Sequence, residues 1–185
     1  MAEHLEGPRG RTVARAQPRR GRMKLGLLCL AILGVAALAF PVAAGSAQFV
    51  WNVTASAPAG LYRIERVRWH TGDRVAVLLA DTLAADLDRR GVLPRGKLLI
   101  KRVVAAAGDS VCRRHGTVFV NDDVVAQAKS NDSTGALLPS WQGCTSLNEG
   151  QVFLLGDTAG SYDGRYFGVT RASEIIGRAH PLLTF

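Results

Sequence analysis

A run of 20 uncharged residues, numbered 25–44, constrains this chain more than any other feature of its sequence. A helix of about 20 apolar residues is long enough to cross the ~30 Å hydrocarbon core of a bilayer. Residues 1–24 carry seven basic and two acidic side chains, and basic residues before an apolar run keep that end cytoplasmic. The sequence therefore predicts a basic cytoplasmic tail at 1–24, one transmembrane helix at 25–44, and residues 45–185 on the far side.

Two interpretations of the apolar run stay open from the sequence. The run is longer than the ~7–15 apolar residues of a usual secretory signal, which favours a retained signal-anchor. Small residues at positions 44–47 are typical of a cleavage site, which favours a cleavable signal. Met23 stands directly before Lys24, so the natural start is either Met1 or Met23.

The high net charge does not indicate a nucleic-acid-binding domain. The chain carries +8, but residues 1–24 supply +5 of it and the other 161 residues only +3. The positive-inside topology already explains the tail, so no nucleic-acid partner is expected. No CxxC or Cys/His spacing typical of zinc is present, and we expect neither a metal nor a cofactor.

The part after the apolar run has the pattern of a mainly β domain. Short apolar runs bounded by Gly or Asp predict strands at 75–79, 97–104 and 152–155, and a hairpin at 118–125. One helix is expected at 79–90, because an Ala- and Leu-rich stretch ends there before Gly91. Residues 126–150 are rich in Ser, Asn, Asp and Gly and predict a long loop. Such short strands are typical of an antiparallel sheet or a barrel-like fold.

Two cysteines, Cys112 and Cys144, lie in the predicted exported part. In an oxidising compartment such as the periplasm they can pair as a disulfide. The closed loop would span about 32 residues, and chain entropy would then stabilise the fold by roughly 3 kcal/mol.

Two polar side chains stand in contexts that suit chemistry. Lys101, inside an apolar strand, either reaches solvent or a carboxylate, or is a desolvated amine able to act as a general base. Lys97 shares its strand face, but lies at the strand start where solvation is easier. Ser56, in a turn of small residues, is either a turn serine or, beside a neutral lysine, a nucleophile. The nearby Thr54 could offer its hydroxyl to an oxyanion.

Four segments in order resemble the conserved boxes of type I signal peptidases. They are Thr54–Tyr62 around Ser56, Gly72–Val75, Lys101–Asp109 and Gly156–Gly168. The Thr-x-Ser-x-Pro-x-Gly-Leu-Tyr form of the first is similar to the conjugative-transfer branch, the TraF-type peptidases. The resemblance covers roughly residues 50–180 and implies a signal-peptidase fold behind one N-terminal transmembrane helix.

The resemblance also implies roles for individual residues. Ser56 would be the nucleophile and Lys101 its general base, in a Ser-Lys dyad. The Ser56 N–H and the Thr54 hydroxyl would form the oxyanion hole, and Ser161 would orient the Lys101 amine. Asp163 and Arg165 would form a supporting pair, and Arg102 would be structural. Ile100 would line the substrate pocket.

Two departures from the housekeeping pattern stand out. Proline follows Ser56 at a shorter spacing, so substrate pockets do not transfer from that pattern. Gly164 stands between Asp163 and Arg165 where a serine is usual.

The resemblance implies a bacterial inner-membrane protein, single-pass and N-in, with a periplasmic catalytic domain. Its substrate would be an exported precursor with small residues before the scissile bond, in this branch pilin, and its partners conjugative type IV secretion components. The acyl-enzyme could be resolved by water or by the pilin's own amine, which would close a ring. The alternatives are a general type I signal peptidase and a non-catalytic component of the transfer channel. LexA-like self-cleaving repressors need a DNA-binding domain, which residues 1–44 do not supply.

Overall fold

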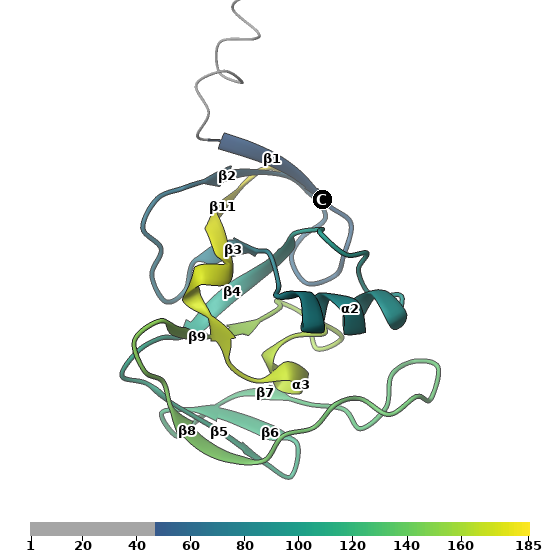
Figure 1. Cartoon of the computed structure of the whole chain (residues 1–185), viewed down its shortest axis with the longest axis vertical. Coiled ribbons are helices and arrows are strands. Elements are labelled where there is room, and N and C mark those ends of the chain that lie inside the picture. The colour runs from purple at the N-terminus through teal and green to yellow at the C-terminus, as the bar shows by residue number, and fades with distance from the viewer. Residues whose placement is uncertain (1–46) are drawn as a thin grey trace, which may run out of the picture. The chain divides into compact units, whose positions relative to one another are not determined.

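The computed structural model describes residues 47–185, which form two antiparallel sheets (Figure 1). The larger sheet has the order β1-β2-β11-β3-β4-β9-β10. Its strands are β1 (Ala47–Asn52), β2 (Gly60–Glu65), β11 (Ile175–Thr184), β3 (Arg74–Val77), β4 (Leu99–Ala105), β9 (Gln151–Leu155) and β10 (Thr170–Arg171). The smaller sheet has the order β7-β6-β5-β8, with β7 (Asp123–Gln127), β6 (Thr117–Val120), β5 (Ser110–Arg114) and β8 (Gly143–Ser146).

The expected mainly β, antiparallel architecture is confirmed. The barrel-like form is not, because within residues 47–185 both sheets are open, the larger one ending at β1 and β10. Within residues 47–185 the helical elements are α2 (Asp81–Arg89), the short α3 (Gly164–Phe167) and the 3-10 turn η1 (Ala172–Glu174). The helix expected at 79–90 is α2, which buries Leu87 against the core.

Local sequence patterns predicted several strands correctly. The expected strands at 75–79, 97–104 and 152–155 are β3, β4 and β9. The expected hairpin is β6–β7, and Asn121 and Asp122 in its turn have φ of 48° and 70°. Two successive positive φ values suit a tight turn whose twist matches that of the flanking strands.

Other strands had no local signal. The expected loop at 126–150 contains the end of β7 and all of β8, whose four residues are exposed. Strand β8 lacks an apolar alternation and exists because it pairs with β5. Strands β1, β2, β5 and β11 were also not expected. Strand β11 contains Gly177 and Pro181, which are unusual in strand interiors, yet it lies between β2 and β3 in the larger sheet.

The two sheets share a core around β9. Phe153 and Leu155 pack with side chains of the smaller sheet, including Val111 and Val118. From the same strand, Leu154 packs with residues of β3, β4 and α2. Strand β9 is followed by the 156–161 segment, so the shared core fixes the base of that segment.

The expected disulfide is present. Cys112 of β5 and Cys144 of β8 are directly opposed and bonded, 32 residues apart in sequence.

Removal of this bond should destabilise the domain. We expect a Cys112→Ala, Cys144→Ala double variant to lose about 3 kcal/mol of unfolding free energy, because the unfolded chain regains the entropy that the loop had removed. Urea unfolding of wild type, the double variant and reduced wild type measures the loss. Equal midpoints for oxidised and reduced wild type would contradict it.

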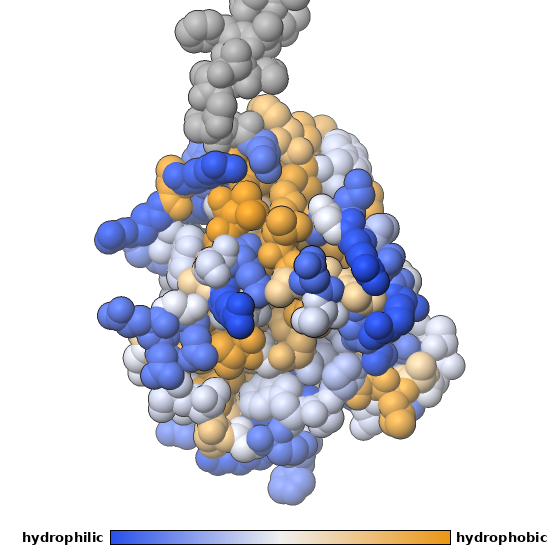
Figure 2. Space-filling model, in the orientation of Figure 1, coloured by the Kyte–Doolittle hydropathy of each residue, from blue (hydrophilic) through white to orange (hydrophobic). Residues whose placement is uncertain are grey.

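The predicted tail at 1–24 and transmembrane segment at 25–44 lie outside the described residues. Over residues 47–185, no helix combines the length and apolar character needed to span a bilayer. Apolar side chains do gather at the surface around β1 and the end of β11, as Figure 2 shows in orange. The large exposed ones there are Phe49, Trp51, Leu182, Leu183 and Phe185.

Candidate active site

Ser56 lies in the turn that joins β1 to β2, and its side chain is buried. Asn52, the last residue of β1, organises this turn. Its Nδ2 donates to the carbonyl oxygens of Thr54 and Ala57, both at 2.9 Å, and to that of Pro58 at 3.1 Å. The two protons of this single buried amide are thus shared among three turn carbonyls, which fixes the backbone on both sides of Ser56.

The side chain of Thr54 connects Asn52 to Ser56. Its hydroxyl donates to Asn52 Oδ1 at 2.9 Å and lies 2.8 Å from Ser56 Oγ. Because a hydroxyl has one proton, Ser56 is the donor in the second contact. An oxyanion role for Thr54 would therefore require its proton to rotate away from Asn52.

Lys101 lies in β4 and is only 2% exposed. Its Nζ donates to Ser161 Oγ at 2.7 Å, and no carboxylate of residues 47–185 lies within salt-bridge distance of it. Burial lowers the pKa of Lys101 to about 8, while the charge of Asp163 opposes that shift. The alternative of a lysine that reaches solvent or a carboxylate is therefore wrong, and Lys97 is the exposed one.

Gly156 brings Ser56 and Ser161 together. A Cβ on this residue would overlap Ser161 Oγ and lie 3.2 Å from Ser56 Cα. The next residue, Asp157, donates its backbone N–H to the Ser56 carbonyl at 2.8 Å. The lysine that Ser161 binds therefore lies in the same cluster as Ser56. The Ser56 hydroxyl itself bonds Thr54, and among the described residues it makes no direct hydrogen bond with Lys101.

Asp163 and Arg165 form a buried ion pair that holds the 156–161 segment. Arg165 Nε and Nη2 donate to the two oxygens of Asp163 at 2.8 and 2.6 Å, and the side chains of Arg165 and Asp163 are 3% and 0% exposed. Arg165 also donates to the carbonyls of Thr158 and Ala159, at 2.7 and 3.1 Å. Asp163 accepts the Gly156 N–H at 2.7 Å. The expected pair is present, and it is the main support of this segment.

A second, more exposed cluster joins three of the recognised sequence segments. Arg74 and Arg102 are directly opposed on β3 and β4, and both donate to the carboxylate of Asp157. Arg102 also donates to the Gly72 carbonyl at 2.7 Å, in keeping with its expected structural role. Sequence reasoning assigned no role to Arg74, Asp157 or Asn52. Arg74 and Asp157 lie inside the recognised segments. The available signal for Asn52 was its position as an amide directly after the apolar residues 49–51.

The unusual Gly164 has a packing reason. A Cβ there would lie 2.7 Å from the Leu154 carbonyl oxygen and 2.8 Å from a ring carbon of Phe153. Both contacts are shorter than real Cβ atoms make, so a serine at this position would require β9 or the Phe153 ring to move.

An apolar groove of about 320 Å³ leads to Thr54 from the side of β1. It is lined by Val50, Trp51, Asn52, Val53, Thr54, Leu93, Pro94, Lys97 and Leu98. Ile100, the expected pocket residue, is 1% exposed and packs in the core against Ala57 and Ala76. The geometry therefore lends no support to a pocket-lining role for Ile100.

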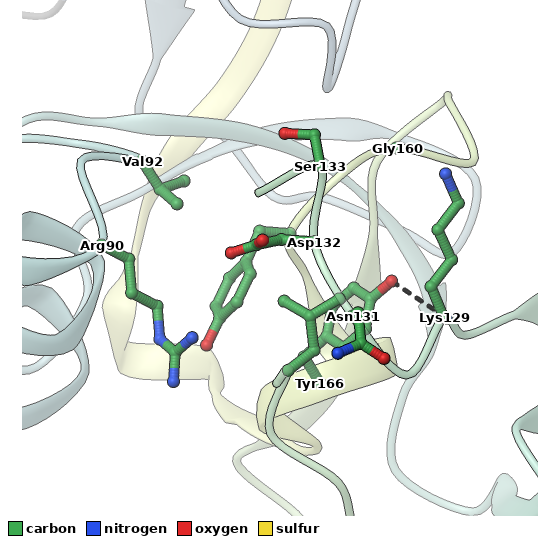
Figure 3. A pocket seen from close by; sticks show the side chains of 10 residues that line it. Arg90, Val92, Lys129, Asn131, Asp132, Ser133, Gly160 and Tyr166 are labelled. Carbon is green, nitrogen blue, oxygen red and sulfur yellow. Dashed lines mark hydrogen bonds between the residues drawn. The ribbon is translucent and has the colours of Figure 1, made fainter. Parts of the chain in front are cut away.

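A separate hollow of about 230 Å³ is lined by Tyr162 and Tyr166 and by side chains of the 129–138 loop (Figure 3). Neither Ser56 nor Lys101 lines it. Within residues 47–185, no cluster of three or more His, Cys, Asp or Glu side chains is placed to hold a metal ion.

The lowered pKa of Lys101 predicts a specific pH dependence for any reaction that uses this amine as a base. Only neutral lysine can accept a proton, so the rate should rise about tenfold per pH unit below about 8 and level off above it. The pH profile of single-turnover rates measures this. A plateau that extends down to pH 6 would show that Lys101 is not the base.

Comparison with known proteins gives one family match, several relatives in sequence and a similar solved structure. The family described as "Signal peptidase, peptidase S26" matches residues 22–183. "Plasmid transfer protein TraF" of Escherichia coli is 33% identical over 167 residues, which cover 84% of this chain and 94% of that protein. "Probable conjugal transfer protein TraF" of Sinorhizobium fredii is 36% identical over 180 residues, 90% of this chain and 94% of the relative. A crystal structure of a signal peptidase I from Enterococcus faecalis aligns with a TM-score of 0.37 and 21% identity, covering 62% of this chain and 98% of that one.

Proposed function

The chain belongs to the signal peptidase family, peptidase S26, and from this membership we propose that it is a serine endopeptidase with Ser56 and Lys101 as its catalytic dyad. The observation that carries the proposal is the environment of Lys101. Its amine is buried, has no carboxylate partner within residues 47–185, and has a pKa lowered to about 8. Ser-Lys chemistry requires an amine that is partly neutral near physiological pH, and this amine lies in the same cluster as the buried Ser56.

We propose the following course for the reaction. The Ser56 hydroxyl turns from Thr54 toward Lys101, gives its proton to the neutral amine, and its Oγ attacks the scissile carbonyl. The oxyanion receives hydrogen bonds from the Ser56 N–H and the Thr54 hydroxyl. One donor of this kind stabilises the transition state by about 2.7–4 kcal/mol. The tetrahedral intermediate then expels the amine, which takes the proton from the Lys101 ammonium, and an ester on Ser56 remains.

The ester is resolved by a second attacker whose proton also goes to Lys101. Water as the attacker gives a trimmed linear product. The amino terminus of the same substrate as the attacker gives a ring and regenerates the Ser56 hydroxyl. Both routes use the same residues, so the dyad supports either outcome.

We propose an exported precursor, of the conjugative pilin class, as the substrate. The relatives with more than 30% identity over most of this chain are named as plasmid or conjugal transfer proteins. Strand β1 is an edge of the larger sheet, and an extended peptide can add to such an edge. The apolar groove beside β1 leads to Thr54 and so toward Ser56. With residues 25–44 as an anchor, this site would work at the periplasmic surface of the inner membrane.

Mass spectrometry of a co-expressed pilin precursor from the same conjugation system tests the proposal. Wild-type enzyme should shorten the precursor, and Ser56→Ala and Lys101→Ala enzymes should leave it intact. A product lighter by one water, about 18 Da, than the trimmed linear mass would identify cyclisation. A precursor that stays full-length with folded wild-type enzyme would argue against pilin.

The family match also favours a second candidate, a general type I signal peptidase. Cleavage of several unrelated secretory precursors by the wild-type enzyme would support it. A non-catalytic role in the transfer channel remains the third, and predicts that conjugation survives both Ser56→Ala and Lys101→Ala.

A further inference from the structure

Arg113 of β5 is a buried cation that the proposed reaction does not use. Its side chain is 4% exposed, and no carboxylate of residues 47–185 lies within salt-bridge distance. Its hydrogen bond goes from Nη1 to the backbone carbonyl of Arg165 at 2.7 Å, and its Nε has no partner among the described residues. An unpaired buried guanidinium lowers stability, so its position calls for a specific reason.

Two further contacts join the same region to α3. Trp141, in the segment leading to β8, donates its Nε1–H to the Gly164 carbonyl at 3.0 Å. The backbone N–H of Lys129, just after β7, donates to the Tyr166 hydroxyl at 3.2 Å, the dashed line in Figure 3. Three consecutive residues of α3, 164–166, are thus bound from the smaller sheet and its loop.

These contacts lead to the catalytic lysine by a short route. Arg165, whose carbonyl Arg113 binds, holds Asp163 and the carbonyls of Thr158 and Ala159 with its side chain. The segment held in this way ends in Ser161, which accepts the hydrogen bond of Lys101 Nζ. Among the three contacts to residues 164–166, the one from Arg113 is made by a charged side chain. Arg113 lies on β5, the strand that the disulfide links to β8.

We propose that Arg113 is a positioning residue. It binds the backbone carbonyl of Arg165 and fixes that residue, which keeps Ser161 in contact with the Lys101 amine and excludes water from that contact. The inference rests on the proposed function for its catalytic meaning. Its structural part, the placement of Ser161, can be tested without any substrate.

The test measures the protonation of Lys101 directly. The chain has only four lysines, so the full-length protein in detergent, labelled with ¹³C at lysine Cε, gives few signals, and Lys101→Met identifies the relevant one. Arg113→Met replaces the arginine by an unbranched side chain without its charge and removes the donor to the Arg165 carbonyl. In wild type Lys101 should titrate near pH 8, and in Arg113→Met its pKa should move upward toward the ordinary lysine value of 10.5, because water reaches the amine.

The other groups that act on Lys101 stay in place in this comparison. Asp163, Arg165 and Asp157 are the charges that influence its pKa, and none is altered. Arg113→Lys keeps one donor and should restore the wild-type titration. Arg114→Ala is the matched control, because Arg114 is the exposed neighbour on the same strand and should change nothing.

The outcomes separate the two proposals. An upward shift in Arg113→Met with recovery in Arg113→Lys supports the positioning role, whether or not any precursor is cleaved. With an identified substrate, processing by Arg113→Met should fall about tenfold or more. An unchanged Lys101 titration in folded Arg113→Met would overturn the inference. Global unfolding of Arg113→Met would also overturn it, since Arg113 would then support the whole domain and not one segment.

Discussion

Replacement of Lys101 by Met, or of Ser56 by Ala, should lower precursor processing by roughly 10⁴- to 10⁶-fold. Ser56→Ala removes the atom that attacks, and Lys101→Met removes the base while it keeps the length of the buried side chain. The two residues act in one step, so the double variant should be no slower than either single variant. Single-turnover rates on the identified precursor, quantified by mass spectrometry, measure these effects.

The stability of the same variants separates catalysis from folding. Among the described residues Lys101 has no carboxylate partner, so Lys101→Met removes a buried amine without leaving an opposite charge unpaired, and we expect no loss of unfolding free energy. The control is Lys129→Met, which alters an exposed lysine that does not line the groove beside β1 and should keep full activity. Activity that survives in Lys101→Met and disappears in Lys97→Met would move the base to Lys97.

Asp163→Asn should give the largest loss of stability, about 3–5 kcal/mol of unfolding free energy. Asp163 is fully buried and binds Arg165 through both of its oxygens. The substitution would leave the Arg165 guanidinium buried without a counter-charge, and the amide would also serve the Gly156 N–H less well. Urea unfolding measures the stability, and processing should fall with it because Ser161 loses its support.

Asp157→Asn provides the comparison for that prediction. Asp157 also binds arginines, but its side chain is 21% exposed and the arginines are 25% and 37% exposed. Solvent screens such pairs, so this loss should stay near 0–1 kcal/mol. Equal losses in the two variants would mean that burial of the Asp163–Arg165 pair has no special weight in this fold.

The sequence was informative where local spacing decides the structure. The apolar runs around Val75, Lys101 and Val152 predicted three strands, and the Asn121–Asp122 turn a hairpin, because alternation and turn conformation depend on neighbouring residues. The resemblance of four segments pointed to Ser56, Lys101 and Ser161 as one site. The cluster around Gly156 is consistent with that expectation, and the chemical roles remain predictions.

The tertiary structure decided what depends on residues distant in sequence. The polar strand β8 forms because β5 and the Cys112–Cys144 bond hold it, and β11 joins the sheet centre despite Pro181. The state of the Lys101 amine belongs to the same class. The pKa of Lys101 is lowered by burial, and burial depends on every chain segment that excludes water from the amine. The sequence of β4 alone does not show which segments these are. The sequence by itself therefore identified which lysine could act as a base, and only the packing of β9 and the 156–165 segment around it decided that its amine can be neutral.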